Sequence, residues 1–260
     1  MSKRINLNAD MGESFGVWQM GEDEALLQVV GAANIACGFH AGDPLVMRRT
    51  VRAAVAAGVS LGAHPGYPDL QGFGRRRMEI PAAELEAMLI YQIGALAALA
   101  RAEGGRLCHV KPHGALSNQA CADPALAATV ARAVQAVDGD LILLAPACSE
   151  LARAGQAAGL PVALEIFADR AYQADGQLVP RSRPGALIHD PEQALAHVLA
   201  MLKEGALRGA DGSRLSTPIH SVCVHGDGPQ ALATARCLHR GLAAAGWALS
   251  PLGEVPRAGA

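Results

Sequence analysis

The 260-residue sequence has few aromatic side chains and no excess charge of either sign. Phe, Tyr and Trp make up 3% of it, so a core must come mainly from the Ala, Leu, Val and Ile within the 51% hydrophobic fraction. The formal net charge is −2, with Lys and Arg scattered rather than clustered. Nucleic acids and anionic membranes attract concentrated positive charge, so we expect neither as a partner.

Targeting signals, membrane spans and paired cysteines are also missing. Residues 1–10 carry early charge and then strand-like residues, with no apolar signal core. The longest nearly apolar stretch, residues 88–100, is shorter than the roughly 20 residues that cross a bilayer. None of the six cysteines forms a C-x-x-C pair, and Cys37 and Cys223 lie in apolar runs typical of a core. We therefore expect a cytoplasmic protein with reduced thiols and one domain over residues 1–260.

Nucleotide-binding loops are absent too. No G-x-G-x-x-G follows the first apolar run, and no G-x-x-x-x-G-K-[ST] occurs anywhere. The first absence disfavours an open dinucleotide-binding sheet. The second means that the chain has no recognisable phosphate loop for ATP.

What the sequence does contain is a repeated unit of strand, loop and helix. Its short apolar runs are continuous rather than alternating, which is typical of parallel strands buried on both faces. Three of the intervening segments begin with Asp-Pro, at 43–44, 123–124 and 190–191, which suits a helix N-cap followed by Pro at the first helical position. About seven such units predict an α/β fold, a seven-stranded β/α barrel. The runs are residues 5–9, 33–37, 59–63, 107–110, 141–145, 162–166 and 221–224.

Polar residues follow the ends of these runs. In a parallel barrel, the carboxyl ends of the strands share one face, where active sites are built. We therefore predict that six of these residues surround one pocket: Asp10, His40, His64, Lys111, His113 and Asp227. The other polar residues near strand ends are Glu13, Asp43, Asp69, Glu165, Asp169, Arg170 and His225.

Several polar residues have a simpler structural interpretation. We expect Asp43 to cap a helix, Asp69 to brace its own loop and Glu165 to face a neighbouring strand. Residues 75–77, three arginines, are typical of a solvated face, and His109 inside a run is typical of a hydrogen-bonded core histidine. Four further histidines lie away from the strand ends and are expected to be structural: His189, His197, His220 and His239.

The segment 168–187 interrupts the repeat. A connection of this length without a helical pattern is typical of a lid, a binding arm or a mobile surface arm. We predict that it borders the pocket and that Arg181 or Arg183 reaches toward an anionic group.

Six stretches carry a family resemblance: "INLNADMGESFG" (5–16), "NIACGFHAGDP" (34–44), "GAHPGYPDLQGFGRR" (62–76), "VKPHGAL" (110–116), "FADRAY" (167–172) and "VHGDGP" (224–229). With these motifs in this order, the chain resembles the LamB/YcsF family. The resemblance implies an irregular seven-stranded barrel of the glycoside hydrolase and deacetylase type. It also implies ATP-dependent opening of the 5-oxoproline lactam to glutamate, in a complex with subunits B and C.

The resemblance and lactam chemistry together suggest roles. An amide is a poor electrophile, so its hydrolysis needs an activated carbonyl, a positioned water and a proton for the leaving nitrogen. Partner subunits would handle ATP, while Asp10 or Asp227 would act as base and His113 or His64 as acid. Lys111 or Arg170 would pair with a carboxylate or phosphoryl group. The full substrate-binding set is Glu13, His40, Asp169, Arg170, Arg181 and His225.

Two other functions remain open at this point. One is a metal-dependent amidohydrolase or deacetylase acting alone, with Asp10, His40 and His64 as ligands of a divalent ion. The histidines named for this site show no compact H-x-x-x-H spacing, so the sequence alone leaves a metal undecided. The other is a non-catalytic subunit that binds a small acid for its partners.

Overall fold

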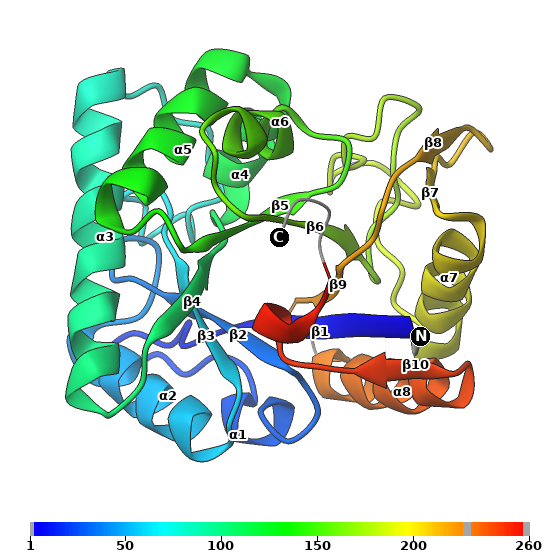
Figure 1. The fold of residues 1–260 in the computed structure, drawn as a ribbon, viewed down its shortest axis with the longest axis horizontal. Coiled ribbons are helices and arrows are strands. Elements are labelled where there is room, and N and C mark those ends of the chain that lie inside the picture. Colours follow the sequence, from blue (N-terminus) through cyan, green and yellow to red (C-terminus); the bar gives the residue numbers. More distant parts are fainter. Residues whose placement is uncertain (1–2, 226–229, 257–260) are drawn as a thin grey trace.

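Seven parallel strands close into a barrel in the computed structural model, which describes residues 3–225 and 230–256 (Figure 1). Each strand pairs with the next, and β1 pairs with β9 to close the ring. All seven predicted runs are strands to within one or two residues, so the predicted barrel is confirmed. The strands are β1 (Lys3–Met11), β2 (Ala32–Ala36), β3 (Ser60–His64), β4 (Leu107–Val110), β5 (Ile142–Pro146), β6 (Val162–Phe167) and β9 (Ser221–Val224).

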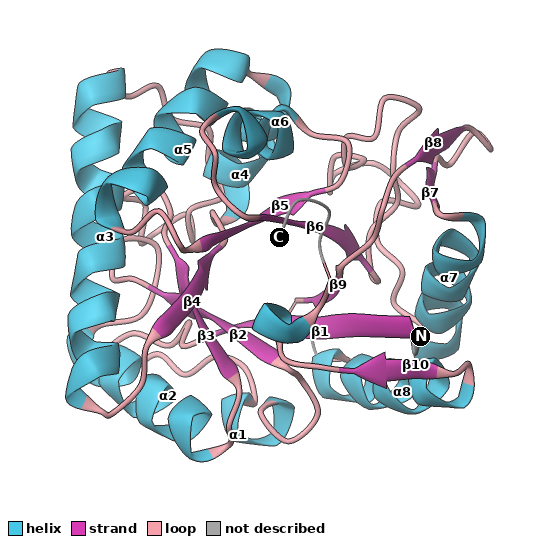
Figure 2. Cartoon of the chain, in the orientation of Figure 1, coloured by secondary structure: helices cyan, strands magenta, loops and turns pink. Residues whose placement is uncertain are grey.

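Helices lie outside the barrel, between consecutive strands (Figures 1 and 2). The three helices predicted to start at Asp-Pro do so, and in each the Asp side chain accepts backbone N–H groups of the first turn. The described helices are α1 (Asp23–Leu26), α2 (Pro44–Ala56), α3 (Ala82–Ala102), α4 (Gly114–Ala122), α5 (Pro124–Val137), α6 (Glu150–Ala157), α7 (Pro191–Glu204) and α8 (Ala231–Ala244), with a 3₁₀ turn η1 (Leu252–Glu254).

Three short strands were not predicted. β10 (Trp247–Leu249) pairs in parallel with the beginning of β1, outside the closed ring. β7 (Ala206–Arg208) and β8 (Arg214–Ser216) form an antiparallel hairpin after α7. Strands of three residues are too short to show a hydrophobic period, which explains why the sequence did not indicate them.

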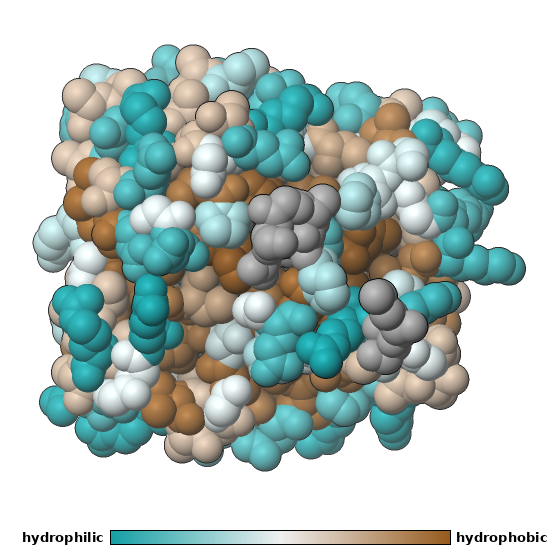
Figure 3. Space-filling view, in the orientation of Figure 1, coloured by the Kyte–Doolittle hydropathy of each residue, from teal (hydrophilic) through white to brown (hydrophobic). Residues whose placement is uncertain are grey.

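Helix α3 corrects one expectation. It has 21 residues, and by length and composition it is the one helix among the described residues that could cross a membrane. The expectation that the apolar segment at residues 88–100 is too short to cross a bilayer was wrong on its length, because the helix starts earlier, at Ala82. In the barrel, α3 packs along α5, and its buried residues include Leu85, Leu89 and Ile93. Hydrophilic side chains occur on all sides of the face shown in Figure 3.

The inside of the barrel is more polar than its outer layer. Asn6, Asn8, Asn34 and His109 are fully buried there, whereas alanine, leucine and valine fill the space between strands and helices. His109 Nε2 lies 2.7 Å from Asn34 Oδ1, and its ring occupies the space that a side chain at Gly62 would need. The predicted core role of His109 is confirmed.

Candidate active site

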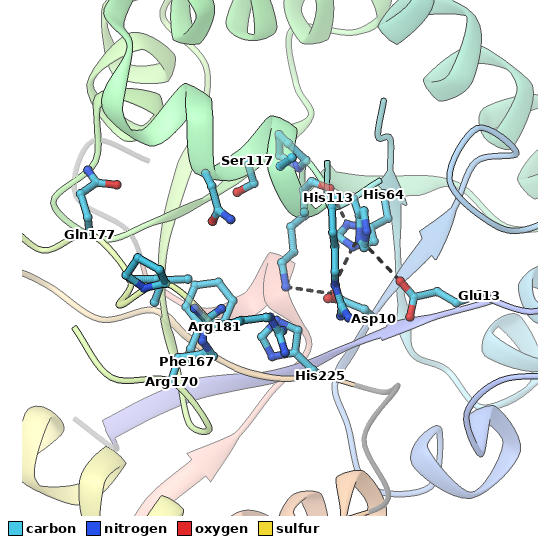
Figure 4. A pocket seen from close by; sticks show the side chains of 18 of the residues that line it. Asp10, Glu13, His64, His113, Ser117, Phe167, Arg170, Gln177, Arg181 and His225 are labelled. Carbon is cyan, nitrogen blue, oxygen red and sulfur yellow. Dashed lines mark hydrogen bonds and ion pairs between the residues drawn. The ribbon is translucent and has the colours of Figure 1, made fainter. Parts of the chain in front are cut away.

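A cavity of about 450 Å³ lies where the strands end (Figure 4). Eight of the predicted site residues line it: Asp10, Glu13, His64, Lys111, His113, Arg170, Arg181 and His225. Asp169 is not among the lining residues, but it contacts His225, which is. Asp227 falls outside the described residues. Most of the site residues that were predicted from their position after successive strands therefore do lie together.

Asp10 and Lys111 form an ion pair at the bottom of the cavity. Asp10 Oδ1 accepts hydrogen bonds from Lys111 Nζ at 2.9 Å and from Asn34 Nδ2 at 2.8 Å. Burial raises the pKa of Asp10, but His64 and Lys111 lower it by more, and the net pKa is well below its usual value. Asp10 is therefore ionised at neutral pH, with one oxygen fixed by these two donors.

Lys111 is almost fully buried, with acceptors around its ammonium group. Its Nζ lies 3.3 Å from Glu165 Oε2 and 2.9 Å from Cys223 Sγ. Burial lowers the pKa of Lys111, but Asp10, Cys223 and Glu165 raise it by more, and the net pKa is well above its usual value. Lys111 therefore acts as a fixed positive charge rather than as a base.

Glu165 was interpreted from sequence as facing a neighbouring strand. It points into the barrel, where Asn8 and Lys111 contact its Oε2. Burial raises its pKa despite the charge of Lys111. A carboxylate in an otherwise apolar strand was the signal that could have placed it in the site, because such groups are buried only with a partner.

His64 and His113 have a defined arrangement of protons. His64 Nδ1 lies 2.6 Å from the backbone oxygen of Lys111, and His113 Nε2 lies 2.8 Å from that of Phe73. A carbonyl oxygen only accepts hydrogen bonds, so both of these ring nitrogens carry a proton. The remaining nitrogens, His64 Nε2 and His113 Nδ1, face each other at 3.0 Å. Burial lowers the pKa of His113 well below its usual value, which favours the neutral ring.

Glu13 and His40 complete a cluster around this histidine pair. Glu13 Oε1 lies 3.6 Å from His113 Nδ1 and 3.6 Å from His40 Nε2. The ring of His40 stacks on that of His113 with centroids 3.7 Å apart, and it is fully buried behind the cavity wall. Burial lowers the pKa of His40 well below its usual value. One possible ligand atom from each of Glu13, His40, His64 and His113 lies within 4.8 Å of the others.

The opposite wall of the cavity comes from the 168–187 segment. It has no helix, as predicted, and it contributes Arg170 and Arg181, whereas Arg183 is not among the lining residues. Arg170 donates to the oxygen of Val179 at 2.8 Å, and burial lowers its pKa to about 10. Figure 4 places Arg170 and Arg181 across the cavity from Glu13 and His113.

The loop after β3 is partly as predicted. Asp69 accepts hydrogen bonds from Gly72 and Arg76, so its bracing role is confirmed. Arg75 is exposed, as expected of a solvated face, and it also lines the cavity, with its guanidinium 4.9 Å above the ring of Phe73. Phe73 has a φ of 54° and so turns the chain back toward the site, which the sequence pattern did not indicate.

A parallel barrel with acidic, imidazole and ammonium groups at its carboxyl end has the architecture in which β/α-barrel enzymes build their active sites. The model of the LamB/YcsF family matches residues 5–257, and the chain belongs to this family. It is 67% identical over 252 residues to the A subunit of 5-oxoprolinase from Azoarcus sp. (strain BH72), covering 97% of this chain and 98% of the relative.

A solved structure of a similar protein agrees with this assignment. The crystal structure of the lactam utilization protein from Thermus thermophilus superimposes with a TM-score of 0.89 at 44% identity, covering 95% of this chain and 99% of that one. A GH113 β-1,4-mannanase shares the fold alone, with a TM-score of 0.50 at 9% identity, covering 93% of this chain and 99% of that chain. The barrel is therefore of the type that glycoside hydrolases also use.

Proposed function

We propose that this chain is the lactam-opening subunit of an ATP-dependent 5-oxoprolinase. It would convert ATP-activated 5-oxo-L-proline to L-glutamate together with subunits B and C. The names of the relatives support this proposal. The observation that carries it is the division of one cavity between an ionised, fixed carboxylate and a pair of arginines.

The arginines suit a small carboxylic acid. Arg170 and Arg181 line the same wall, and the buried Nε of Arg170 has no hydrogen-bond partner among the described residues. Guanidinium groups bind carboxylates through paired hydrogen bonds. The substrate carboxylate would lie against this wall, which points its lactam ring toward Asp10.

Asp10 suits the proton transfers of ring opening. One of its oxygens is held by Lys111 and Asn34, while Oδ2 lies 3.4 Å from His64 Nε2 at the cavity. ATP would phosphorylate the lactam oxygen; water then adds to the lactam carbon, and Asp10 passes one proton of this water to the ring nitrogen. As the C–N bond breaks, the added hydroxyl becomes the carbonyl of an acyl phosphate, and its proton also goes to the nitrogen, which leaves as an amine. A second water then hydrolyses the remaining acyl phosphate to glutamate and phosphate. The histidines predicted as acids face each other, so we place the proton transfer on Asp10.

ATP would be bound by the partner subunits, because the sequence has no phosphate-binding loop. The test is to measure glutamate formation from 5-oxoproline by this chain alone, by subunits B and C alone, and by the mixture, each with and without ATP. We expect turnover only in the mixture with ATP. Equal ATP-dependent turnover by B and C alone would contradict the proposal.

The cluster of Glu13 with three histidines favours a second candidate, a metal-dependent amidohydrolase that acts alone. The same experiment separates the two candidates. Turnover of 5-oxoproline by the isolated chain without ATP would select the amidohydrolase.

A further inference from the structure

The facing nitrogens of His64 and His113 require something between them. Both rings donate their other N–H to backbone oxygens, so in the neutral rings His64 Nε2 and His113 Nδ1 each present a lone pair. At 3.0 Å these lone pairs repel each other unless a proton or a cation lies between them. Glu13 Oε1, 3.6 Å from His113 Nδ1, adds a carboxylate on the same side.

We propose that Glu13, His64 and His113 bind one divalent transition-metal ion of the zinc type, with a fourth position open to the cavity. Zinc bound to nitrogen at about 2.0–2.1 Å in a tetrahedron places its ligand atoms about 3.3 Å apart. The distances of 3.0 and 3.6 Å lie on either side of that value. Two histidines, one glutamate and an open position form a known catalytic zinc arrangement.

The surroundings hold these rings in place. The backbone oxygens of Lys111 and Phe73 fix the protonation of both rings, as the outer partners of metal-binding histidines do. A Cβ at Gly74 would lie 2.8 Å from His113 Cδ2, so the loop backbone packs directly on the ring. The site is therefore built before any ion binds.

His40 and Asp10 lie next to the proposed metal site but are not among its ligands. The stacked rings of His40 and His113 are parallel within 2°. Because a ring nitrogen binds an ion in the plane of its own ring, the two rings cannot both bind one ion unless one of them rotates. Neither nitrogen of His40 makes a hydrogen bond among the described residues, and the ring closes the back of the site. Asp10 Oδ2, 3.4 Å from His64 Nε2, is placed to accept a hydrogen bond from a metal-bound water. The proposed set thus keeps His64 from the ligands suggested by sequence and replaces Asp10 and His40 with Glu13 and His113.

A bound ion would lower the pKa of its water toward neutrality and polarise an adjacent carbonyl. Binding itself can be measured without any turnover. A failure to bind metal can therefore be distinguished from a failure of the proposed 5-oxoprolinase function.

The test begins with full-length protein that carries no histidine tag. After treatment with chelator and its removal, the protein is titrated with Zn²⁺ and Co²⁺ by calorimetry, and bound metal is counted by elemental analysis. We expect one ion per chain. The Co²⁺ form should show visible absorption typical of tetrahedral coordination and two imidazole N–H protons with paramagnetically shifted resonances. This spectroscopic measurement needs no variant.

The variants Glu13→Gln and His113→Gln should each weaken Zn²⁺ binding by at least about 100-fold, because changes even in outer-shell partners cost 10–100-fold. Matched controls are Glu84→Gln at the start of α3 and His239→Gln on α8, both outside the cavity lining, and they should bind as the wild type does. Circular dichroism of the metal-free forms verifies that each variant is folded.

Two results would overturn the proposal. The first is the absence of stoichiometric binding of either metal by the wild type, in which case a proton lies between the two histidines. The second is unchanged affinity in folded Glu13→Gln and His113→Gln, which would place the ion elsewhere.

Discussion

The two walls of the cavity are built in different ways. The strand-end half comprises Asp10, Glu13, His64 and His113, which lie at or just after the carboxyl ends of β1, β3 and β4, and each is buried. The loop half comprises Arg170 and Arg181 in the 168–187 segment, where Arg170 is buried and Arg181 is exposed. The groups proposed to react are thus fixed by the barrel, whereas the groups proposed to recognise the substrate lie on a long connection. Loops can change without disturbing the scaffold, so substrate choice can vary while the chemistry stays.

The largest effect should come from the strand-end half. Asp10→Asn keeps the shape of the side chain but cannot take a proton, so turnover by the complex with B and C should fall by about 10²–10⁴-fold. The fold should persist, because Glu165 still lies 3.3 Å from Lys111. The measurement is ATP-dependent glutamate formation, with exposed Asp140→Asn as control. Full activity in folded Asp10→Asn would instead support a non-catalytic binding subunit.

Removing the buried cation should cost stability. Lys111→Met leaves Asp10 and Glu165 without their ammonium partner, and loss of one member of a buried ion pair costs about 3–5 kcal/mol. Urea denaturation of the isolated chain measures the free energy of unfolding. The control Lys203→Met, at an exposed position of α7, should change it by less than about 0.5 kcal/mol. Equal stability of the two variants would contradict the charge assignments.

In the loop half, the expected effect is on substrate binding. Arg181→Ala should raise the KM for 5-oxoproline about tenfold, the equivalent of about 1.4 kcal/mol, with little change in kcat. Arg183→Ala is the matched control, because Arg183 belongs to the same segment but does not line the cavity. If both variants keep the wild-type KM, the recognition role of this wall is wrong.

The smallest effect should come from the contact between Asp169 and β9. His225 Nδ1 lies 2.8 Å from Asp169 Oδ2. Burial raises the pKa of Asp169, but His225 lowers it by more, and the net pKa is below its usual value. A lowered folded-state pKa stabilises the protein above the unfolded value of about 3.9, and this contribution is lost as pH falls through the folded pKa. The difference in unfolding free energy between wild type and Asp169→Asn should therefore be present at pH 6 and shrink toward about pH 2. A difference that stays constant over this range would contradict the pairing.

The fold was more predictable than the orientation of side chains. Buried parallel strands are continuous apolar runs, so seven runs and three Asp-Pro caps indicated the barrel and the end at which polar residues meet. Glu165 was misplaced because its direction depends on the partner Lys111, and the contact of the exposed Arg75 with the cavity was not foreseen because it depends on the turn at Phe73. Distances between residues on different strands, such as His64 and His113, depend on strand register, which local sequence does not contain.

The closure between β1 and β9 has a consequence for how the protein acquires activity. Asn6 pairs with Ser221, 215 positions later in the chain, and Asp10 and His225 extend from these two closing strands. Contacts between such distant segments form late, because the entropy of closing a long loop must be overcome first. The cavity is therefore complete only once the last barrel strand has docked, and a growing chain that has not yet reached residue 225 has no finished site.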